Sequence, residues 1–597
     1  MRIRIVAAAL AAGFLCGPST AAAADLDCDR LGAQATEAER WRRPLLQRSY
    51  ERRRAAGLAL AECAYRTQAD RALSAAIDDR RFARLTPEQR RLTLSTAAMN
   101  AWRLEQLERA RDRYMRALAA DPHDPDDWYR LSILERVRGQ NDVSAEVLLH
   151  LIETWPELLD RLDDQHVFGL IHGLAPESRR RLDLLQALFD ANWNRAGKGA
   201  DPAWYELALM RIVRGEPEAA RAAIRRIDTP GELIKLRADR RFDGLVDRDA
   251  AAFDVGQAAQ RQIDRYRVLA QSQPDSLELR MELSYALLSA GREQEALAYS
   301  NQVLAAIAEA PADAPAFADL GDEVWLMNNR AIALRRLGQT DEALLELQRA
   351  SRYRESGSIN VSQALNLGGY YAALGRADEA LAAAARAGDD ISGYGRMVQA
   401  QVQLRGAVLK GDRAGAQRAL DYLREHRADA HTLWLEALLQ AARVDEAQTA
   451  LLELLASPTE RSDALAWLQR YREAPVLPGD REWLARKAEL LSRAGGGGAG
   501  RPHRALSDLR GQRAVASRRW RAGILRGRPP HRSPACTAPI PATRTPCAAS
   551  RRSATSATPS IIRRSRSAST PTTTIPRIRK VSSATCSTCS RSSATSW

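Results

Sequence analysis

The sequence has few of the residues that most often carry enzyme or metal chemistry. It contains 8 histidines and 7 cysteines in 597 residues. It has no H-E-x-x-H or G-x-S-x-G pattern, and no G-x-G-x-x-G after a predicted strand. His166 and His172 do not share a helix face as an i, i+4 pair would, and Cys586-x-x-Cys589 lacks a second pair at zinc spacing. The sequence therefore predicts no catalytic, metal or cofactor site and favours a binding protein.

Long apolar segments are also absent after the N-terminus. No later stretch reaches the roughly 18–20 residues that a membrane-spanning helix needs. At the N-terminus, two arginines precede an apolar run over residues 5–16, and alanines at 22–24 precede Asp25. This pattern is typical of a secretory signal peptide over residues 1–24, the alternative being an ordinary N-terminal helix. We therefore expect export to a bacterial periplasm, with outer-membrane association as an option.

Two cysteines remain when the signal peptide and the C-terminal tail are set aside. These are Cys28 and Cys63. In an oxidising compartment they can form one disulfide that fixes the N-terminal segment. Two separate thiols are an equal alternative from the sequence alone.

Positive charge is concentrated at the C-terminal end. Residues 501–597 contain 20 Lys or Arg and one acid, Asp508, whereas the rest of the chain contains 69 basic and 73 acidic residues. The body is therefore nearly neutral, and its composition does not indicate nucleic-acid binding. After the glycine run at 495–498, helical periodicity stops and Arg, Ser, Thr and Pro dominate, which predicts a disordered tail.

Two interpretations of this tail remain open. The Ala-, Arg- and Leu-rich body suggests GC-rich coding, and such DNA read out of frame yields Arg, Pro, Ser, Thr and Cys. Glycine codons begin with GG, so the run at 495–498 is a natural place for a slip, and we favour a frameshift product over residues 495–597. The alternative is a disordered basic tail that binds nucleic acid or another polyanion.

A glycine followed five residues later by an alanine recurs between helix-patterned segments. The pairs are Gly215/Ala220, Gly291/Ala296, Gly338/Ala343, Gly375/Ala380 and Gly411/Ala416, with degenerate copies Gly139/Ser144 and Ala442/Ala447. Glycine suits the left-handed residue after a helix end, and alanine suits a close helix crossing. The recurrence predicts an all-α stack of hairpins, none of which can bury its apolar face alone.

Signature positions are shared between these units. The matching residues, unit by unit, are Ala110, Tyr114, Ala117 and Pro122; Trp128, Leu131, Gly139 and Pro156; Trp204, Leu207, Ala208, Gly215 and Ala220; and Leu367, Gly368, Tyr371, Gly375 and Ala380, the last unit fitting the full pattern of the first helix. This pattern resembles the tetratricopeptide repeat (TPR), W-x2-L-G-x2-Y followed by A-x3-F, A and P, over about residues 89–458. The resemblance implies a TPR-type α-solenoid, a right-handed superhelix of hairpins, in which Trp128 and Trp204 are packing residues.

These patterns divide the chain into six parts. We expect a signal peptide (1–24), an N-terminal helical segment (25–88), a first TPR array (89–235), a degenerate helical repeat (236–276), a second TPR array (277–494) and the basic tail (495–597). A second degenerate unit is expected near 160–200, because Gly139, Gly215 and Gly291 are spaced by about two repeats.

The TPR resemblance also implies where a partner binds. In TPR proteins the first helices of successive repeats line a concave groove that takes an extended peptide or a partner helix. The groove residues expected here are Asn328, Asn329, Arg335, Arg336, Asn366 and Tyr370. Asn329 and Asn366 share one repeat position, and their amides can bind a main chain. The alternative is that these asparagines bond neighbouring backbone.

We therefore expect an exported, non-enzymatic scaffold or adaptor that binds a protein or peptide, with no transmembrane helix after signal removal and no nucleic acid on the body. A signal peptide before a TPR array is similar to NfrA-type outer-membrane proteins of phage adsorption and exopolysaccharide secretion. This similarity implies an envelope secretion complex as partner. The competing function is polyanion binding by the tail.

Overall fold

The structure, a computed structural model, describes residues 28, 50–355, 358–388, 391, 393–472 and 474–496. The expected signal peptide and residues 497–597 of the basic tail lie outside these residues. The first helices are α2 (Tyr50–Glu62), α3 (Arg66–Ile77), η2 (Phe82–Arg84), α4 (Pro87–Arg103), α5 (Leu107–Ala120), α6 (Pro125–Val137), α7 (Asn141–Thr154), η3 (Pro156–Arg161), α8 (Asp164–Gly173), α9 (Arg179–Asp190), α10 (Asp201–Val213), α11 (Pro217–Ile224), α12 (Pro230–Ala238), η4 (Arg240–Phe242) and η5 (Ala251–Phe253).

The chain continues with α13 (Val255–Ser272), α14 (Leu277–Ser289), α15 (Glu293–Glu309), η6 (Leu320–Asp322), α16 (Glu323–Arg336), α17 (Thr340–Ala350), β1 (Arg354–Glu355), β2 (Ser358–Ile359), α18 (Val361–Ala373), α19 (Ala377–Arg386), α20 (Gly393–Lys410), α21 (Arg413–Glu425), η7 (Arg427–Asp429), α22 (His431–Gln440), α23 (Val444–Ala456), α24 (Arg461–Trp467), η8 (Pro478–Asp480) and α25 (Arg481–Gly496). β1 and β2 form one short antiparallel pair in an otherwise helical body.

The turns between paired helices share one backbone geometry. At Gly139 the backbone N–H donates to the carbonyl of Arg136, and the N–H of Gln140 donates to the carbonyl of Glu135, both across 2.9 Å. The φ of Gly139 is +76°, a left-handed conformation that costs glycine no Cβ clash. The same pair of bonds and positive φ recur at Gly215, Gly291, Gly338, Gly375 and Gly411.

Three more turns adopt this geometry without glycine. Ala64, Glu105 and Ala442 have φ values of 61°, 62° and 60°. The residue five positions later is in each case an alanine with no exposed surface: Ala69, Ala110 and Ala447. The hairpin geometry therefore extends N-terminally to α2–α3, into the segment expected to be a separate helical region.

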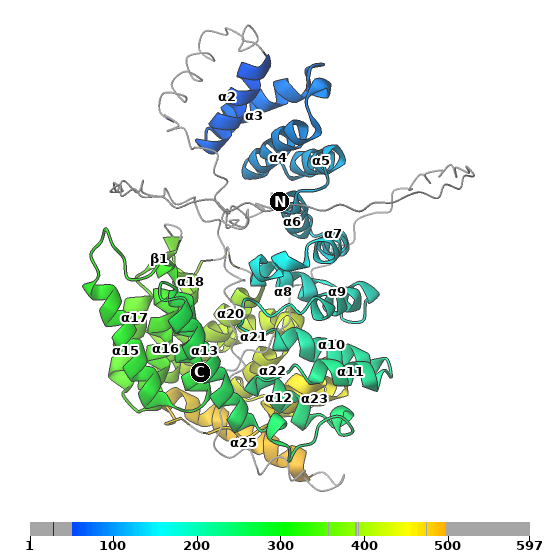
Figure 1. Cartoon of the computed structure of the whole chain (residues 1–597). Helices are drawn as coiled ribbons and strands as arrows, with labels where there is room; N and C mark the ends of the chain where they lie inside the picture. The colour runs from blue at the N-terminus through cyan, green and yellow to red at the C-terminus, as the bar shows by residue number, and fades with distance from the viewer. Residues whose placement is uncertain are drawn as a thin grey trace, which may run out of the picture. The chain divides into compact units, whose positions relative to one another are not determined.

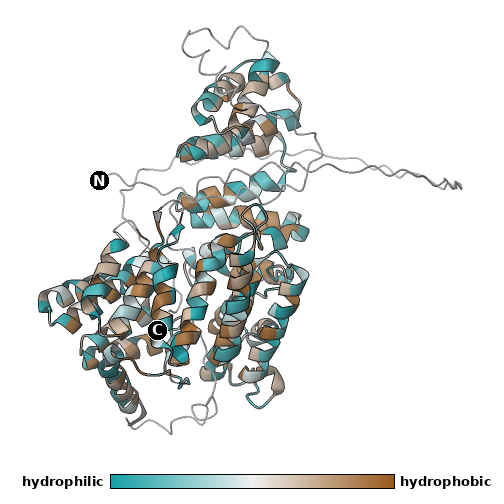
Figure 2. Cartoon of the chain, turned by 90° about the vertical axis from the view of Figure 1, so that its left-hand side faces the viewer, coloured by the Kyte–Doolittle hydropathy of each residue, from teal (hydrophilic) through white to brown (hydrophobic). Residues whose placement is uncertain are grey.

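Each hairpin buries its apolar face against its neighbours. The first helices of successive hairpins contact each other: α14 contacts α16, α18 contacts α20, and α20 contacts α22. Neighbouring hairpins lie side by side along the chain (Figure 1). Apolar and hydrophilic residues alternate along the helices (Figure 2), and the buried apolar residues form local clusters of adjacent hairpins. This packing confirms the all-α, TPR-type α-solenoid.

The N-terminal end of the described body carries a disulfide. Cys63, directly after α2, is bonded to Cys28, and their Cα atoms are 5.4 Å apart. Among the described residues, no helix is both long enough and apolar enough to cross a membrane.

Candidate partner-binding site

Polar side chains on the first helices of adjacent hairpins contact one another. Asn366 Nδ2 on α18 donates to Asn328 Oδ1 on α16 across 3.1 Å. Gln401 Nε2 on α20 donates to Glu436 Oε2 on α22 across 3.3 Å. We call these four residues the polar strip. Asn366 is half-buried and the other three are buried. Packing as well as hydrogen bonds therefore holds these four side chains in place on α16, α18, α20 and α22.

Two predicted groove residues instead join α16 to the preceding hairpin. Asn329 Nδ2 donates to the carbonyl of Met281 across 3.1 Å, and Arg336 Nη1 donates to the carbonyl of Leu288 across 2.7 Å. Both carbonyls belong to α14. Asn329 therefore makes the neighbouring-backbone contact that was the alternative to ligand binding.

Tyr370 lies in the core. Its side chain has no exposed surface, and its hydroxyl donates to the carbonyl of Thr340 across 3.1 Å. Burial raises the pKa of Tyr370 to about 12. The expectation that Tyr370 faces a partner does not hold in this structure, because its ring fills the space between hairpins α16–α17 and α18–α19.

Arg335 binds a carboxylate from far along the chain. Its Nη2 lies 3.2 Å from Asp480 Oδ2, and Nη2 of Arg405 on α20 lies 2.5 Å from Asp480 Oδ1. Trp483 Nε1 donates to the same Oδ1 across 3.0 Å. Asp480 is 1% exposed, and burial lowers the pKa of Arg405 while Asp480 opposes that effect. Two arginines from different hairpins thus hold one buried carboxylate. Hydrogen bonds between charged groups of this kind are the strongest that side chains form.

The residues before Asp480 are fitted to the same surface. Leu477 is buried and packs in the apolar cluster that contains Leu334, Leu367 and Tyr370. A Cβ added to Gly479 would lie 2.1 Å from the carbonyl oxygen of Ala372, so only glycine allows the turn to approach the end of α18 this closely. We call residues 477–483 the Asp480 turn.

A hollow lies beside the polar strip, between α18 and α20. It is lined by the polar side chains of Asn366, Gln401 and Arg405, by the apolar side chains of Leu365, Val398 and Val402, and by Gly369. Amides can bind a main-chain amide and the apolar residues can contact a small apolar side chain. The hollow shares Arg405 with the site of Asp480.

The α22 end of the strip is covered by the chain itself. Trp467 Nε1, on α24, donates to Glu436 Oε1 across 3.4 Å. The Lys487 ammonium on α25 lies 4.2 Å from the centre of the Trp467 ring, and burial lowers the pKa of Lys487. The most accessible residue of the strip is therefore Asn366 on α18.

The segment around α24 also contacts the middle of the array. Lys235 Nζ on α12 lies 2.7 Å from Asp463 Oδ1, and Ser462 Oγ donates to Asp239 Oδ2 across 2.7 Å. Arg241 Nη1 donates to the carbonyl of Pro458 across 2.6 Å. These contacts join residues more than 200 positions apart. A repeat pattern predicts contacts between adjacent repeats and therefore does not predict these.

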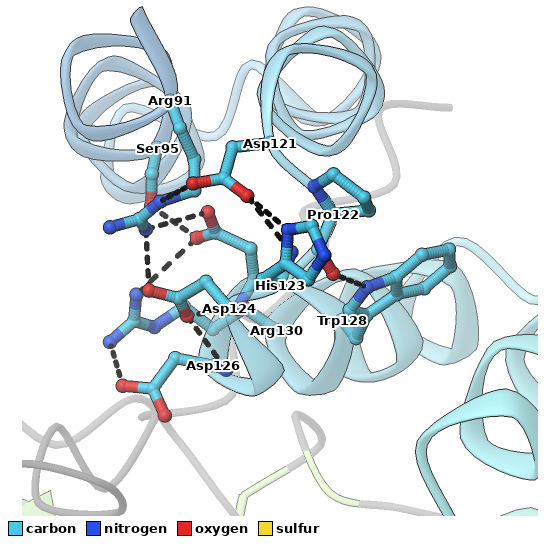
Figure 3. Close-up of polar contacts among 10 residues, drawn as sticks. Arg91, Ser95, Asp121, Pro122, His123, Asp124, Asp126, Trp128 and Arg130 are labelled. Atoms are coloured by element: carbon cyan, nitrogen blue, oxygen red, sulfur yellow. Dashed lines mark hydrogen bonds and ion pairs between the residues drawn. The ribbon is translucent and has the colours of Figure 1, made fainter. Parts of the chain in front are cut away.

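A second polar cluster joins α4 to the start of α6 (Figure 3). Arg91 on α4 lies 2.5 Å from Asp124 and 3.2 Å from Asp127, and Ser95 on α4 donates to Asp127. Asp127 is fully buried, and burial raises its pKa. Because guanidinium groups match these carboxylates, the cluster fixes the spacing of two hairpins. No group of acids, histidines or cysteines in the described part of the chain is arranged to hold a metal ion.

The two signature tryptophans pack between helices. Trp204 is buried, and Trp128 is half-buried, with its ring centre 4.2 Å from that of His150. The Nε1 of Trp128 donates to the carbonyl of Pro122 across 2.8 Å (Figure 3).

Sequence reasoning missed Gln401, Arg405, Asp480 and Trp483. Gln401 and Arg405 lie on α20, the first helix of the hairpin whose turn is at Gly411, so the same register that located Asn366 includes their helix. Asp480 lies beyond the repeats, and the only local signal for it is the Pro-Gly-Asp turn at 478–480.

Comparison with protein-family models finds no match, and neither does comparison with curated proteins. Among solved structures, the chain is similar to the APC/C hetero-tetramer Cut9–Hcn1, with TM-score 0.30 and 14% identity over 78% of this chain and 84% of that one. It is similar to yeast Tom70, with TM-score 0.26 and 11% identity over 79% and 97%. It is also similar to the human IFIT1 dimer with m7Gppp-AAAA, with TM-score 0.28 and 13% identity over 67% and 76%.

Proposed function

We propose that this protein is an exported scaffold that binds a protein or peptide partner at the hollow between α18 and α20, beside the polar strip. The observation that carries the proposal is the hollow between these helices, where Asn366 and Gln401 offer amide groups beside apolar side chains. An amide has both a donor and an acceptor, so it can pair with the main chain of an extended peptide.

The scaffold suits such a site because its helices hold the polar groups in place. Gln401 is buried and bonded to Glu436, and Asn366 is bonded to Asn328. Side chains ordered before binding lose less conformational entropy when the partner arrives. Specificity then comes from the spacing of amides on successive hairpins.

The proposal is tested by site-specific photo-crosslinking in the native host. A crosslinking residue is placed at Val398 in the hollow and, as the matched control, at Leu345, which is 60% exposed on α17. We expect discrete crosslinked species from position 398 and none from position 345. Equal labelling at both positions, or none at position 398, refutes the site.

A double variant then tests the chemistry of the contact. Asn366→Ala with Gln401→Ala removes two amides, and each lost hydrogen bond weakens binding by about 0.5–1.5 kcal/mol. We expect the crosslinks from position 398 to fade while the far-ultraviolet circular dichroism is unchanged. Crosslinks of undiminished intensity in a folded variant would contradict the role of the amides.

We further propose an envelope location, in a system of the polysaccharide-secretion or phage-adsorption kind. The signal-like residues 1–24 and the Cys28–Cys63 bond support export, because disulfides persist in oxidising compartments. We expect periplasmic or outer-membrane fractions to contain a form that begins at Asp25. Recovery of an uncleaved chain in the cytosol with both thiols free would exclude export.

A further inference from the structure

The Asp480 turn contacts the array in the way that a bound ligand would. Leu477 enters an apolar cluster, Gly479 abuts the end of α18, and Asp480 pairs with arginines of two hairpins. Arginines in well-packed, desolvated pockets are typical of the energetically dominant centres of protein–protein interfaces. The turn is also remote in sequence from its contacts, since Arg335 and Asp480 are 145 positions apart.

The site on the array is selective for a carboxylate. The side chains of Arg335 and Arg405 are only 9% and 10% exposed. Asp480 pairs with both guanidinium groups, and a buried guanidinium without its carboxylate is strongly unfavourable. A neutral replacement therefore leaves a site whose charge, shape and hydrogen-bond donors all favour an acidic group.

We propose that Arg335 and Arg405 form a carboxylate-binding site for an acidic turn of a partner protein, and that the Asp480 turn is a built-in competitor that occupies this site. The partner segment carries an apolar residue, a glycine and an aspartate in the order of residues 477–480. This inference rests on the proposed function only in placing the partner next to the hollow that contains Arg405.

The covalent connection explains why the turn occupies its own site. A tethered segment competes at an effective concentration that reaches the millimolar range for short flexible linkers. A free peptide of the same sequence must exceed that concentration to displace it. A partner succeeds if it also contacts the hollow, because the second contact adds affinity that the Asp480 turn does not have.

The test uses the full chain and a fluorescent synthetic peptide of residues 474–486. Asp480→Asn in the protein weakens the internal turn, so we expect the peptide to bind this variant at least about tenfold more tightly than it binds the wild type. Asp445→Asn is the matched control, since Asp445 is 92% exposed in its ion pair with Arg493, and it should behave as wild type. Adding Arg405→Gln to the Asp480→Asn chain should abolish binding, as should Asp480→Asn in the peptide.

A purely structural role for the turn gives different results. A folded Asp480→Asn chain that binds no peptide at about 1 mM overturns the proposal. Hydrogen exchange on the wild-type chain decides the case if that variant does not fold. On the wild-type chain, peptide above the millimolar effective concentration of the tethered turn should accelerate exchange of the chain's own residues 477–483. Unchanged exchange at that concentration overturns the proposal. Loss of the crosslinks at position 398 leaves this result untouched, so the two proposals can fail separately.

Discussion

Ala442→Gly should stabilise the last hairpin. Ala442 joins α22 to α23 with a φ of 60°, in the turn that glycine forms at Gly338, Gly375 and Gly411. The Arg443 N–H donates to the carbonyl of Leu438 across 2.8 Å, so the turn is fully formed despite its alanine. The substitution keeps these backbone bonds and removes only a methyl group.

Two opposing effects set the size of the change. An L-residue in the left-handed conformation costs about 1–2 kcal/mol, which glycine avoids. Glycine gains more freedom in the unfolded chain, which costs about 0.5–1 kcal/mol. The net expectation is a gain of about 0.5–1 kcal/mol. Glu105→Gly, with a φ of 62°, should gain a similar amount in the turn between α4 and α5.

Urea unfolding followed by circular dichroism measures the effect as a shift of the midpoint at constant slope. Ala441→Gly is the matched control, because Ala441, the residue directly after α22, has a φ of −81° and glycine there should cost about 0.5–1 kcal/mol. The reasoning requires opposite signs at two adjacent alanines. If Ala442→Gly lowers the midpoint as Ala441→Gly does, the left-handed strain is not what distinguishes this turn.

His166 accepts a hydrogen bond from an arginine at Nδ1, and burial holds its pKa well below the usual value. As pH falls, the imidazole of His166 is protonated in the unfolded chain before it is protonated in the folded one, so the free energy of unfolding should decrease below about pH 6.5. His166→Gln should flatten that part of the stability–pH profile, and an unchanged profile would contradict this prediction. At Gly406 a Cβ would lie 2.7 Å from Leu381, so Gly406→Ala should cost about 1–3 kcal/mol in urea unfolding, and adding Leu381→Ala should recover part of the loss. Reducing the Cys28–Cys63 bond, which spans 35 residues, should destabilise the N-terminal hairpin by roughly 3–4 kcal/mol, seen as faster hydrogen exchange in α2; equal exchange in both forms would contradict it.

The repeat pattern was sufficient to predict the hairpins because each hairpin is formed by contacts between residues close together in the sequence. A glycine in the left-handed conformation and an alanine at a helix crossing depend on residues within one unit, as Gly375 and the fully buried Ala380 illustrate. Ala64 and Glu105 adopt the same conformation without glycine, because the surrounding packing outweighs the strain. Their sequence carries no sign of this, so α2–α3 is recognised as part of the array only from the structure.

The candidate site was less predictable because its decisive contacts are not local. The register placed Asn366 correctly on the first helix of its repeat, next to Asn328. It could not foresee that Arg335 pairs with Asp480, since no periodicity links residues 145 positions apart. Tyr370 shows a second limit of sequence-based prediction. An aromatic residue on a first helix is compatible with both the binding groove and the core, so its sequence position does not decide between them.

The contacts of Lys235 and Asp239 with α24 have a consequence for how the chain is made. In a simple array each hairpin is complete once its neighbour has emerged from the ribosome. Here Lys235 contacts Asp463 and Asp239 contacts Ser462. A nascent chain therefore lacks these two contacts for more than 200 residues of synthesis, although Arg241 already pairs with Asp239. The central hairpins reach their final surroundings only when the last ones are translated, and a product that stops short of residue 458 would expose them to proteases.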